Sequence, residues 1–398
     1  MPRFNRQKGA LVIAPHVQYP TRNGSDISLE RVSRYLSHHL PYVDMVASDR
    51  VSRYVGGRVE SERPFANRLR RKAVAGLRVL FKRSHYFRER FNTGPVHSEI
   101  ERTARGGDYG TVLASYLTSR LLIPAALAHC RTLIWTHNDE FKWFQDIAAG
   151  SKSRLTRLVA QQSERFLQEH LVDLADRAQL LHVSETDFAA YRKAIPSHSG
   201  LLVNIGTDLE RPAKWVVRDS VGPVVLTFVS SLSVKMAADA LVHFKNAFEP
   251  VLRANFPRRL QVRIVGSSPS PMVRRVCSEA GWELYADVDE TRLVDLLATT
   301  TFTILPFSYA NGIKLKLIRS LGSGIPFLST AVCQPSTFTA PPYCRFSDAP
   351  LDWCNAIAAW DAVADQTEAH EQLYRIAEAH SWPACVEKLV ADLVASDA

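Results

Sequence analysis

Residues 10–26 of the chain, ALVIAPHVQYPTRNGSD, contain an apolar run, a loop with two prolines and a glycine, and a polar helix start. The run from Ala10 to Ala14 predicts a buried strand, and the helix is expected to begin near Ser25 or Asp26. Strand, small-residue loop and helix are the repeating unit of α/β proteins, and the helix N-terminus offers free N–H groups to anions or sugar hydroxyls. Most such turns bind nothing, so a binding role for Gly24, Ser25 and Asp26 depends on the rest of the chain.

The same unit repeats in both halves of the chain. Short apolar runs predict strands at 10–14, 43–47, 111–114, 132–136, 180–183 and 201–203, and then at 224–229, 261–265, 282–285, 302–305 and 326–329. A polar stretch from Gly206 to Gly222-Pro223 is typical of an interdomain linker. Because 398 residues exceed the usual size of one hydrophobic core, we predict two α/β domains with parallel sheets, at 1–206 and 222–378.

The cysteine pattern and the lengths of the apolar runs indicate the cellular compartment of the protein. The six cysteines are scattered and form no CxxC pair, which favours a reducing environment, and no run approaches 18 apolar residues. The apolar run after the basic N-terminus is too short for a signal peptide. We therefore expect a cytoplasmic protein.

The net charge of +9 is concentrated in one segment. Residues 50–90 contain 13 Lys or Arg and three acids, which gives 13 − 3 = +10. Within it, Leu69, Val74, Leu77, Leu80 and Phe81 have the spacing of an amphipathic helix with a basic face. Three interpretations stay open: an anionic membrane surface or diphosphate-bearing lipid, a solvated face, and nucleic acid, for which no recognition motif is present.

The strand at 132–136 is followed by polar residues at the edge where open α/β sheets bind ligands. His137 is a candidate for contacting a sugar at the reacting centre, and Asp139 is a second candidate catalytic residue. The structural alternative is a helix cap formed by Asn138 or Asp139. The two interpretations do not exclude each other.

The second half contains the strongest candidate anion site. A glycine loop, a helix start and two lysines follow the strand at 302–305, and they suit a diphosphate because backbone N–H groups and ammonium groups meet its charge. Gly266 follows another strand, and Ser231 and Lys235 follow the first strand of this half. The candidate donor-binding residues are Ser231, Lys235, Gly266, Asn311, Gly312, Ile313, Lys314, Lys316 and Arg319.

These residues, in this order, resemble the retaining GT-B glycosyltransferases of family 4. The resemblance continues through Ala175–Asp187, through Val203–Asp208, which is similar to the family's turn before the linker, and through Gly312–Pro326. Ala379-His-Ser-Trp382 resembles the family's ending, whose last helix returns to the N-terminal domain, here at about 382–398. The resemblance covers most of the chain. It implies an α/β fold of GT-B architecture, with two Rossmann-like domains that face each other across a cleft.

The chain departs from the family pattern at the donor site. Family members usually have two glutamates with seven residues between them, and those positions here are Asn311 and Arg319. The family's glycine-arginine after the first donor-domain strand is replaced by Ser230-Ser231, which leaves Lys235 as the nearby cation. Arg319 would suit a donor with an extra phosphate or carboxylate.

The resemblance implies a metal-independent, retaining hexosyltransferase with no cofactor beyond its nucleotide-sugar donor. The acceptor would be a glycan or a lipid-linked sugar, in bacterial surface polysaccharide or glycolipid synthesis, on the inner face of the cell membrane. Its binding residues would be Gly24, Ser25 and Asp26. The alternative is a catalytically silent relative that binds carbohydrate or a partner protein. Asp287-Val288-Asp289 has the form of a metal-binding DxD motif, but Asp289 is better placed as a helix cap, and no GxGxxG fingerprint supports a dehydrogenase.

Overall fold

The computed structural model describes residues 2–19, 24–151, 153–203, 205–209, 222–256, 260–308, 315–334 and 339–395. The chain forms two compact units: unit 1 is Met1–Ile205 with Trp382–Ala398, and unit 2 is Gly206–Ser381. Each unit has its own sheet and its own hydrophobic core. The fold is therefore an α/β fold with two sheets of mainly parallel strands.

Unit 1 is built on a sheet of eight strands in the described ranges, in the order β4-β3-β2-β1-β5-β6-β7-β8. Its strands are β1 (Gly9–Ile13), β2 (Val43–Val46), β3 (Arg50–Val55), β4 (Arg58–Pro64), β5 (Tyr109–Ser115), β6 (Arg131–Thr136), β7 (Ala178–His182) and β8 (Ser199–Leu202). All pairings are parallel except β2 with β3 and β3 with β4. β1, β5 and β6 are buried along their whole length because helices cover both faces of a parallel sheet.

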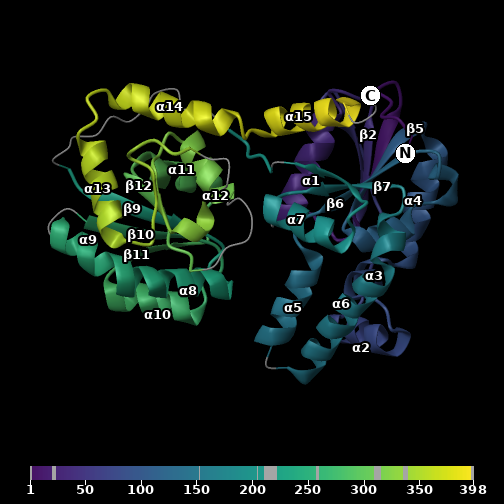
Figure 1. The fold of residues 1–398 in the computed structure, drawn as a ribbon, viewed down its shortest axis with the longest axis horizontal. Coiled ribbons are helices and arrows are strands. Elements are labelled where there is room, and N and C mark those ends of the chain that lie inside the picture. The colour runs from purple at the N-terminus through teal and green to yellow at the C-terminus, as the bar shows by residue number, and fades with distance from the viewer. Residues whose placement is uncertain are drawn as a thin grey trace. The chain divides into compact units, whose positions relative to one another are not determined.

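The helices of unit 1 include the C-terminal helix of the chain. They are α1 (Gly24–Leu36), α2 (Lys72–Lys82), α3 (Tyr86–Phe91), α4 (Gly94–Gly106), α5 (Glu140–Gly150), α6 (Arg154–Ala175), α7 (Glu185–Ala194) and α15 (Trp382–Ala395), with 3₁₀ turns η1 (Leu117–Leu122) and η2 (Ala125–Leu127). α15 lies beside α1 (Figure 1) and buries Trp382, Leu389 and Leu393 in the unit 1 core. The Arg131 guanidinium fixes its end by donating to the Leu393 carbonyl at 3.1 Å.

Unit 2 has a parallel sheet of six strands in the described ranges, in the order β11-β10-β9-β12-β13-β14. These are β9 (Val224–Val229), β10 (Leu260–Gly266), β11 (Glu283–Ala286), β12 (Phe302–Leu305), β13 (Phe327–Ser329) and β14 (Arg345–Phe346). Its helices are α8 (Lys235–His243), the π-helix η3 (Phe244–Phe248), α9 (Glu249–Asn255), α10 (Pro271–Ala280), α11 (Glu290–Ala298), α12 (Leu315–Gly322), the 3₁₀ turn η4 (Ala331–Cys333), α13 (Pro350–Asp361) and α14 (Gln366–Glu378). The core between them is aromatic, with Trp353 packed 4.2 Å from Phe248 between ring centroids.

The basic segment differs from its predicted form, because its first part is an antiparallel hairpin. β3 and β4 are joined through Gly56 and Gly57, which have φ of 53° and 78°. Glycine adopts this left-handed conformation without steric cost, and two such residues suit a tight hairpin turn. The helix that follows, α2, is buried through Ala75, Gly76 and Val79. Its predicted apolar face is outside the core: Val74, Leu77 and Phe81 are exposed.

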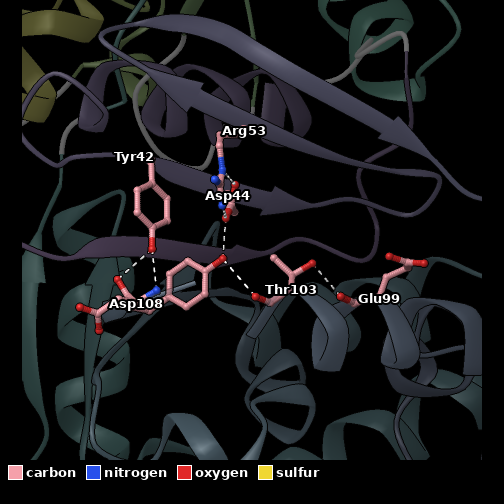
Figure 2. A network of polar contacts seen from close by, with 7 residues as sticks. Tyr42, Asp44, Arg53, Glu99, Thr103 and Asp108 are labelled. Carbon is pink, nitrogen blue, oxygen red and sulfur yellow. Dashed lines mark hydrogen bonds and ion pairs between the residues drawn. The ribbon is translucent and has the colours of Figure 1, made fainter. Parts of the chain in front are cut away.

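A buried carboxylate fastens the hairpin to the parallel part of the sheet (Figure 2). Asp44 on β2 accepts two hydrogen bonds from the Arg53 guanidinium, at 2.8 and 2.7 Å, and one from the Tyr109 hydroxyl at 2.5 Å. Tyr42 bridges to the Asp108 backbone, donating to its carbonyl and accepting from its N–H. A buried charge is tolerated only when it is paired and hydrogen-bonded, and Asp44 meets this condition with its side chain 3% exposed.

Candidate functional site

Three neighbouring strands of unit 1 each deliver a ring to the carboxyl edge of the sheet. His16 follows β1, Tyr116 follows β5, and His137 follows β6. The ring centroids lie 4.8 Å apart for His16 and Tyr116, 4.6 Å for Tyr116 and His137, and 5.6 Å for His16 and His137. We call these three residues the acceptor-side cluster. Their position is the edge at which open α/β sheets bind ligands.

The two imidazoles are short of hydrogen-bond partners. Ser115 Oγ lies 2.8 Å from Nε2 of His137, and Nδ1 of His137 has no hydrogen bond to any residue in the described ranges. Both ring nitrogens of His16 are buried without a hydrogen bond, although Nε2 lies 3.7 Å from Oδ1 of Asp26 and the side chain is only 9% exposed. A buried polar atom without a partner is costly, so the two nitrogens of His16 are suited to a ligand. The half-buried His137 offers its Nδ1 for one further hydrogen bond.

Burial determines the charge of the cluster. It lowers the pKa of His16 to about 3 and, together with the neighbouring His16, lowers the pKa of His137 well below its ordinary value of 6.5. Burial also raises the pKa of Tyr116. All three rings are therefore neutral at pH 7. A neutral imidazole both donates and accepts one hydrogen bond, which suits a sugar hydroxyl.

The structure brings the predicted acceptor-binding residues to this cluster. Gly24 is the first residue of α1, followed by Ser25, whose side chain is near enough to Tyr116 to act on its pKa, and by the buried Asp26 beside His16. The first turn of α1 thus lies against two of the three rings. Its N–H groups are the donors that a helix N-terminus presents.

Asp139 has a structural role in the fold. Its Oδ1 accepts from the backbone N–H of Phe141 at 3.0 Å and of Lys142 at 3.1 Å, which caps α5. Its own N–H donates to Asp187 at 2.8 Å. This is the cap that the sequence offered as the alternative interpretation, and it leaves the candidate catalytic role of Asp139 without a contact to the cluster.

Sequence reasoning missed Glu140, which is fully buried at the start of α5. Its Oε1 accepts from the Leu117 N–H at 3.0 Å, and its Oε2 has no partner in the described part of the chain. Burial raises its pKa to about 8. Leu117 comes directly after Tyr116, whose backbone is left-handed at φ 66°, so Glu140 holds the turn that presents the Tyr116 ring.

A second group of half-buried rings continues from the cluster. Phe87 lies 4.6 Å from Tyr116 and stacks on Trp143 at 5.3 Å, and Phe91 lies 6.3 Å from His16. These rings come from α3 and α5, whose sequence shows no binding motif. In the sequence, His16 and Tyr116 could have been found only by comparing the residues that follow each strand. The other rings are far apart in the chain and come together only in the folded protein.

In unit 2, the loop after β9 and the end of β10 lie against each other. A Cβ on Gly266 would lie 1.7 Å from the Ser230 carbonyl oxygen, so only glycine fits there. Ser231 is exposed with its Oγ 3.1 Å from that of Ser233, and Lys235 begins α8 with Nζ 2.5 Å from Asp239. α8 has no acid in its first turn and no side-chain cap, whereas α10 and α11 are capped by Ser270 and Asp289.

Of the remaining predicted donor-binding residues, the structure describes only some. Asn311, Gly312, Ile313 and Lys314 lie outside the described residues. Lys316 in α12 places Nζ 5.2 Å from the centre of the Phe307 ring, and Arg319 forms an ion pair with Glu290 of α11. Asp289 caps α11 through Arg292 N at 2.8 Å, and Oδ1 of Asp287 accepts from Ser268 N at 2.7 Å, so one oxygen of each carboxylate in the DxD sequence binds backbone.

Comparison with known proteins agrees with this architecture. Residues 223–346 match the family model described as glycosyl transferases group 1. No curated protein sequence matches the chain. The sucrose-phosphate synthase of Thermosynechococcus elongatus is similar in structure, with a TM-score of 0.62 at 15% identity over 98% of this chain and 100% of that one.

Two further solved structures were determined with nucleotides. Anabaena Alr3699/HepE in complex with UDP has a TM-score of 0.59 at 11% identity, over 98% of this chain and 100% of that one. A variant of S. aureus TarM, in complex with fondaparinux, alpha-GlcNAc-glycerol and UDP, has a TM-score of 0.50 at 11% identity over 71% of this chain. The chain spans 55% of the length of that TarM structure. Residues 223–346 thus match the glycosyl transferases group 1 model, and the fold of the chain is similar to the folds of the sucrose-phosphate synthase and of Alr3699/HepE.

Proposed function

We propose that the protein transfers a sugar from a nucleotide-sugar donor to a glycan or lipid-linked acceptor, with retention of anomeric configuration. The observation that carries this proposal is the family match of residues 223–346, which span β9 to β14 of unit 2. Alr3699/HepE, which has the same fold, was solved with UDP and with UDP-glucose. We assign the donor to unit 2 and the acceptor to unit 1.

The donor assignment is supported by the carboxyl edge of the unit 2 sheet. The N-terminus of α8 has no acidic residue in its first turn and no side-chain cap, so its N–H groups suit the diphosphate. Lys235 stands at that helix start, and Lys316 lies on α12. As the sugar leaves, negative charge grows on the diphosphate, and these N–H and ammonium groups would stabilise it without a metal ion.

The acceptor assignment is supported by the acceptor-side cluster. Nδ1 of the neutral His137 would hydrogen-bond a sugar hydroxyl, while Ser115 fixes the ring through Nε2. His16 and the first turn of α1 supply further polar groups, and the half-buried Phe87 and Trp143 offer ring faces. Such positioning lowers a barrier by presenting the hydroxyl in a reactive orientation. Bacterial surface polysaccharide or glycolipid synthesis is the setting that we propose.

A catalytically silent relative is the second candidate, and one observation favours it. Arg319, which occupies the position of a family donor-site glutamate, is paired with Glu290 in this structure. A protein that had lost donor binding would keep the fold and the carbohydrate-binding edge of unit 1. The two candidates differ in whether a nucleotide binds.

Thermal-shift measurements with UDP, GDP, ADP, CMP and their sugars test the proposal. A ligand that binds only the folded state raises the melting temperature, by an amount that grows with the logarithm of its concentration. We expect one nucleotide diphosphate to raise it, and Lys235→Ala to weaken that shift. Lys245→Ala is the matched control, because Lys245 is also in unit 2 and, like Lys235 with Asp239, forms an ion pair, with Glu279. No shift with any nucleotide would support the silent relative.

A further inference from the structure

The exposed face of α2 carries an unusual stripe of apolar side chains. Val74 and Leu77 are each 47% exposed, and Phe81 is 86% exposed. Their spacing of three and four residues places them along one face of the helix. The opposite face, with Ala75, Gly76 and Val79, is buried. We call Val74, Leu77 and Phe81 the α2 stripe.

The buried face of α2 packs against α6. A Cβ on Gly76 would lie 3.2 Å from Cγ2 of Val159, so α2 and α6 are in close contact there. Figure 1 shows α2 beside α6 in unit 1. Near the start of α6, Leu155 and Leu158 are also 40% and 43% exposed. Large apolar side chains that line one exposed helix face, as the α2 stripe does, are typical of a surface that meets a partner.

The charged residues of α2 and of the start of α6 are all basic. Residues 68–83 contain seven Lys or Arg and no acid, and residues 151–159 contain three more and again no acid. Arg71, Lys72 and Arg83 are exposed, and none has an ion pair with a residue of the described ranges. Arg78, by contrast, is paired with Glu89 at 2.8 Å. The surface therefore has an apolar centre and an unneutralised basic rim.

We propose that this surface docks on an anionic lipid bilayer, with the α2 stripe inserted among the headgroups and the basic rim against lipid phosphates. Apolar side chains gain by leaving water, and each nearby Lys or Arg gains from the negative surface potential. No helix in the described ranges is long and apolar enough to span a bilayer, so the contact would be at one surface.

Charge distinguishes a bilayer from a second copy of the chain. In a two-fold dimer the same patch meets itself, and here that would bring two basic rims together without acids to neutralise them. Nucleic acid would meet the basic rim but would leave Phe81 and Leu77 without a favourable partner. An anionic bilayer satisfies both parts of the surface.

Helix α3 connects the docking surface to the acceptor-side cluster within unit 1. α2 contacts α3, and Phe91 at the end of α3 lies 6.3 Å from His16. A lipid-linked acceptor held in the bilayer would thus be one short helix away from the cluster. This last link rests on the proposed function, whereas bilayer docking does not.

Vesicle sedimentation tests the docking with the full chain. Vesicles of phosphatidylcholine alone are compared with vesicles that contain phosphatidylglycerol. We expect at least about tenfold stronger binding to the anionic vesicles, and weaker binding in high salt. Equal binding to both vesicles, or none to either, would overturn the proposal.

Two pairs of variants separate the apolar and basic parts. Leu77→Ser with Phe81→Ser is expected to weaken binding on the order of thirtyfold, and Val172→Ser on α6, where Val172 is 68% exposed, is the matched control. Arg71→Glu with Lys72→Glu is expected to abolish the anionic preference, whereas Arg192→Glu with Lys193→Glu on α7 is expected to preserve it. Unchanged melting temperatures show that the variants fold.

Size-exclusion chromatography completes the test. If the wild type is a dimer that Leu77→Ser with Phe81→Ser converts to a monomer, the stripe is an interface between copies and the proposal is wrong. If the wild type and the variant elute at the same position while only the wild type binds anionic vesicles, the proposal is supported. Loss of vesicle binding is measured without nucleotide, so it is independent of any failure to transfer a sugar.

Discussion

Ser115 Oγ lies 2.8 Å from Nε2 of His137, which ties the end of β5 to the residue after β6. This contact fixes the imidazole in a partly open site where burial keeps it neutral. Because one ring nitrogen is occupied, the other is the one that we propose contacts the acceptor. The ends of β5 and β6 thus contribute together to the proposed acceptor site.

We predict that this contact matters for turnover. Ser115→Ala should lower kcat/KM about fivefold, since one net hydrogen bond is worth about 1 kcal/mol. His137→Ala should lower it by on the order of a hundredfold, because the contact to the acceptor is lost as well as its orientation. Initial rates with the donor identified by thermal shift measure both. If His137→Ala transfers sugar at the wild-type rate, the acceptor assignment is wrong.

Glu140 predicts a loss of stability on the alkaline side. Its pKa is raised by burial from 4.5 to about 8, so folding favours the protonated carboxyl. That contribution is complete below pH 4.5 and is lost as the pH rises through about 8. Glu140→Gln, which is neutral at every pH, should remove this loss. Urea unfolding of both proteins between pH 5 and 9 measures it, and parallel pH curves for the two would contradict the buried, neutral carboxyl.

The buried histidines predict a loss of stability on the acidic side. Burial lowers the pKa of His85 to about 3, and its ring packs against Phe144 at 4.8 Å, away from the acceptor-side cluster. An unfolded histidine takes up its proton near pH 6.5, so stability falls as the pH drops below that value toward 3. For one such residue the loss from pH 7 to pH 5 is about 2 kcal/mol.

His85→Asn tests this acid sensitivity. Asparagine retains a side-chain cap for α3, which His85 provides through Phe87 N at 3.2 Å, but it does not titrate. The variant should lose less stability than the wild type between pH 7 and pH 5 in urea unfolding. The exposed His97, replaced in the same way, is the control and should change nothing. A wild-type-like slope for His85→Asn would refute the prediction.

We predict that no side chain larger than that of glycine is tolerated at position 266, next to the proposed donor site. Gly266→Ala should destabilise unit 2 by at least about 3 kcal/mol, since its Cβ would collide with the rigid Ser230 carbonyl. Gly281→Ala is the comparison, because Gly281 has φ 67° but nothing within 4 Å of a Cβ, and should cost about 1 kcal/mol. Thermal or urea unfolding measures the loss of stability in each variant. A larger loss for Gly281→Ala than for Gly266→Ala would show that the loop after β9 moves aside easily.

The strands could be predicted from the sequence where both sheet faces are buried. β1 and β9 are nearly continuous apolar runs, and such runs have few alternatives to a central parallel strand. The β3–β4 hairpin was missed because the segment was interpreted from its many basic residues. The pair Gly56-Gly57 between two segments of alternating polar and apolar residues was a hairpin signal. Helical spacing showed an apolar stripe on α2 but could not show which side the fold buries.

The candidate site was only partly predictable. His137 follows a strand, and Ser25 and Asp26 lie at the start of a helix. Their polar side chains suggested contacts to a sugar. His16 and Tyr116 have the same placement, but their importance comes from ring contacts between strands far apart in the chain. Glu140 was hidden because burial, rather than sequence, makes its carboxyl neutral.

The most direct measurement is nucleotide diphosphate release from a panel of nucleotide sugars, with acceptor glycans or glycolipids, for the wild type and His137→Ala. We predict that one donor gives acceptor-dependent release by the wild type and that His137→Ala lowers it strongly while the nucleotide still raises the melting temperature. Absence of release with every donor and acceptor, or equal release by both proteins, would contradict the proposed transfer.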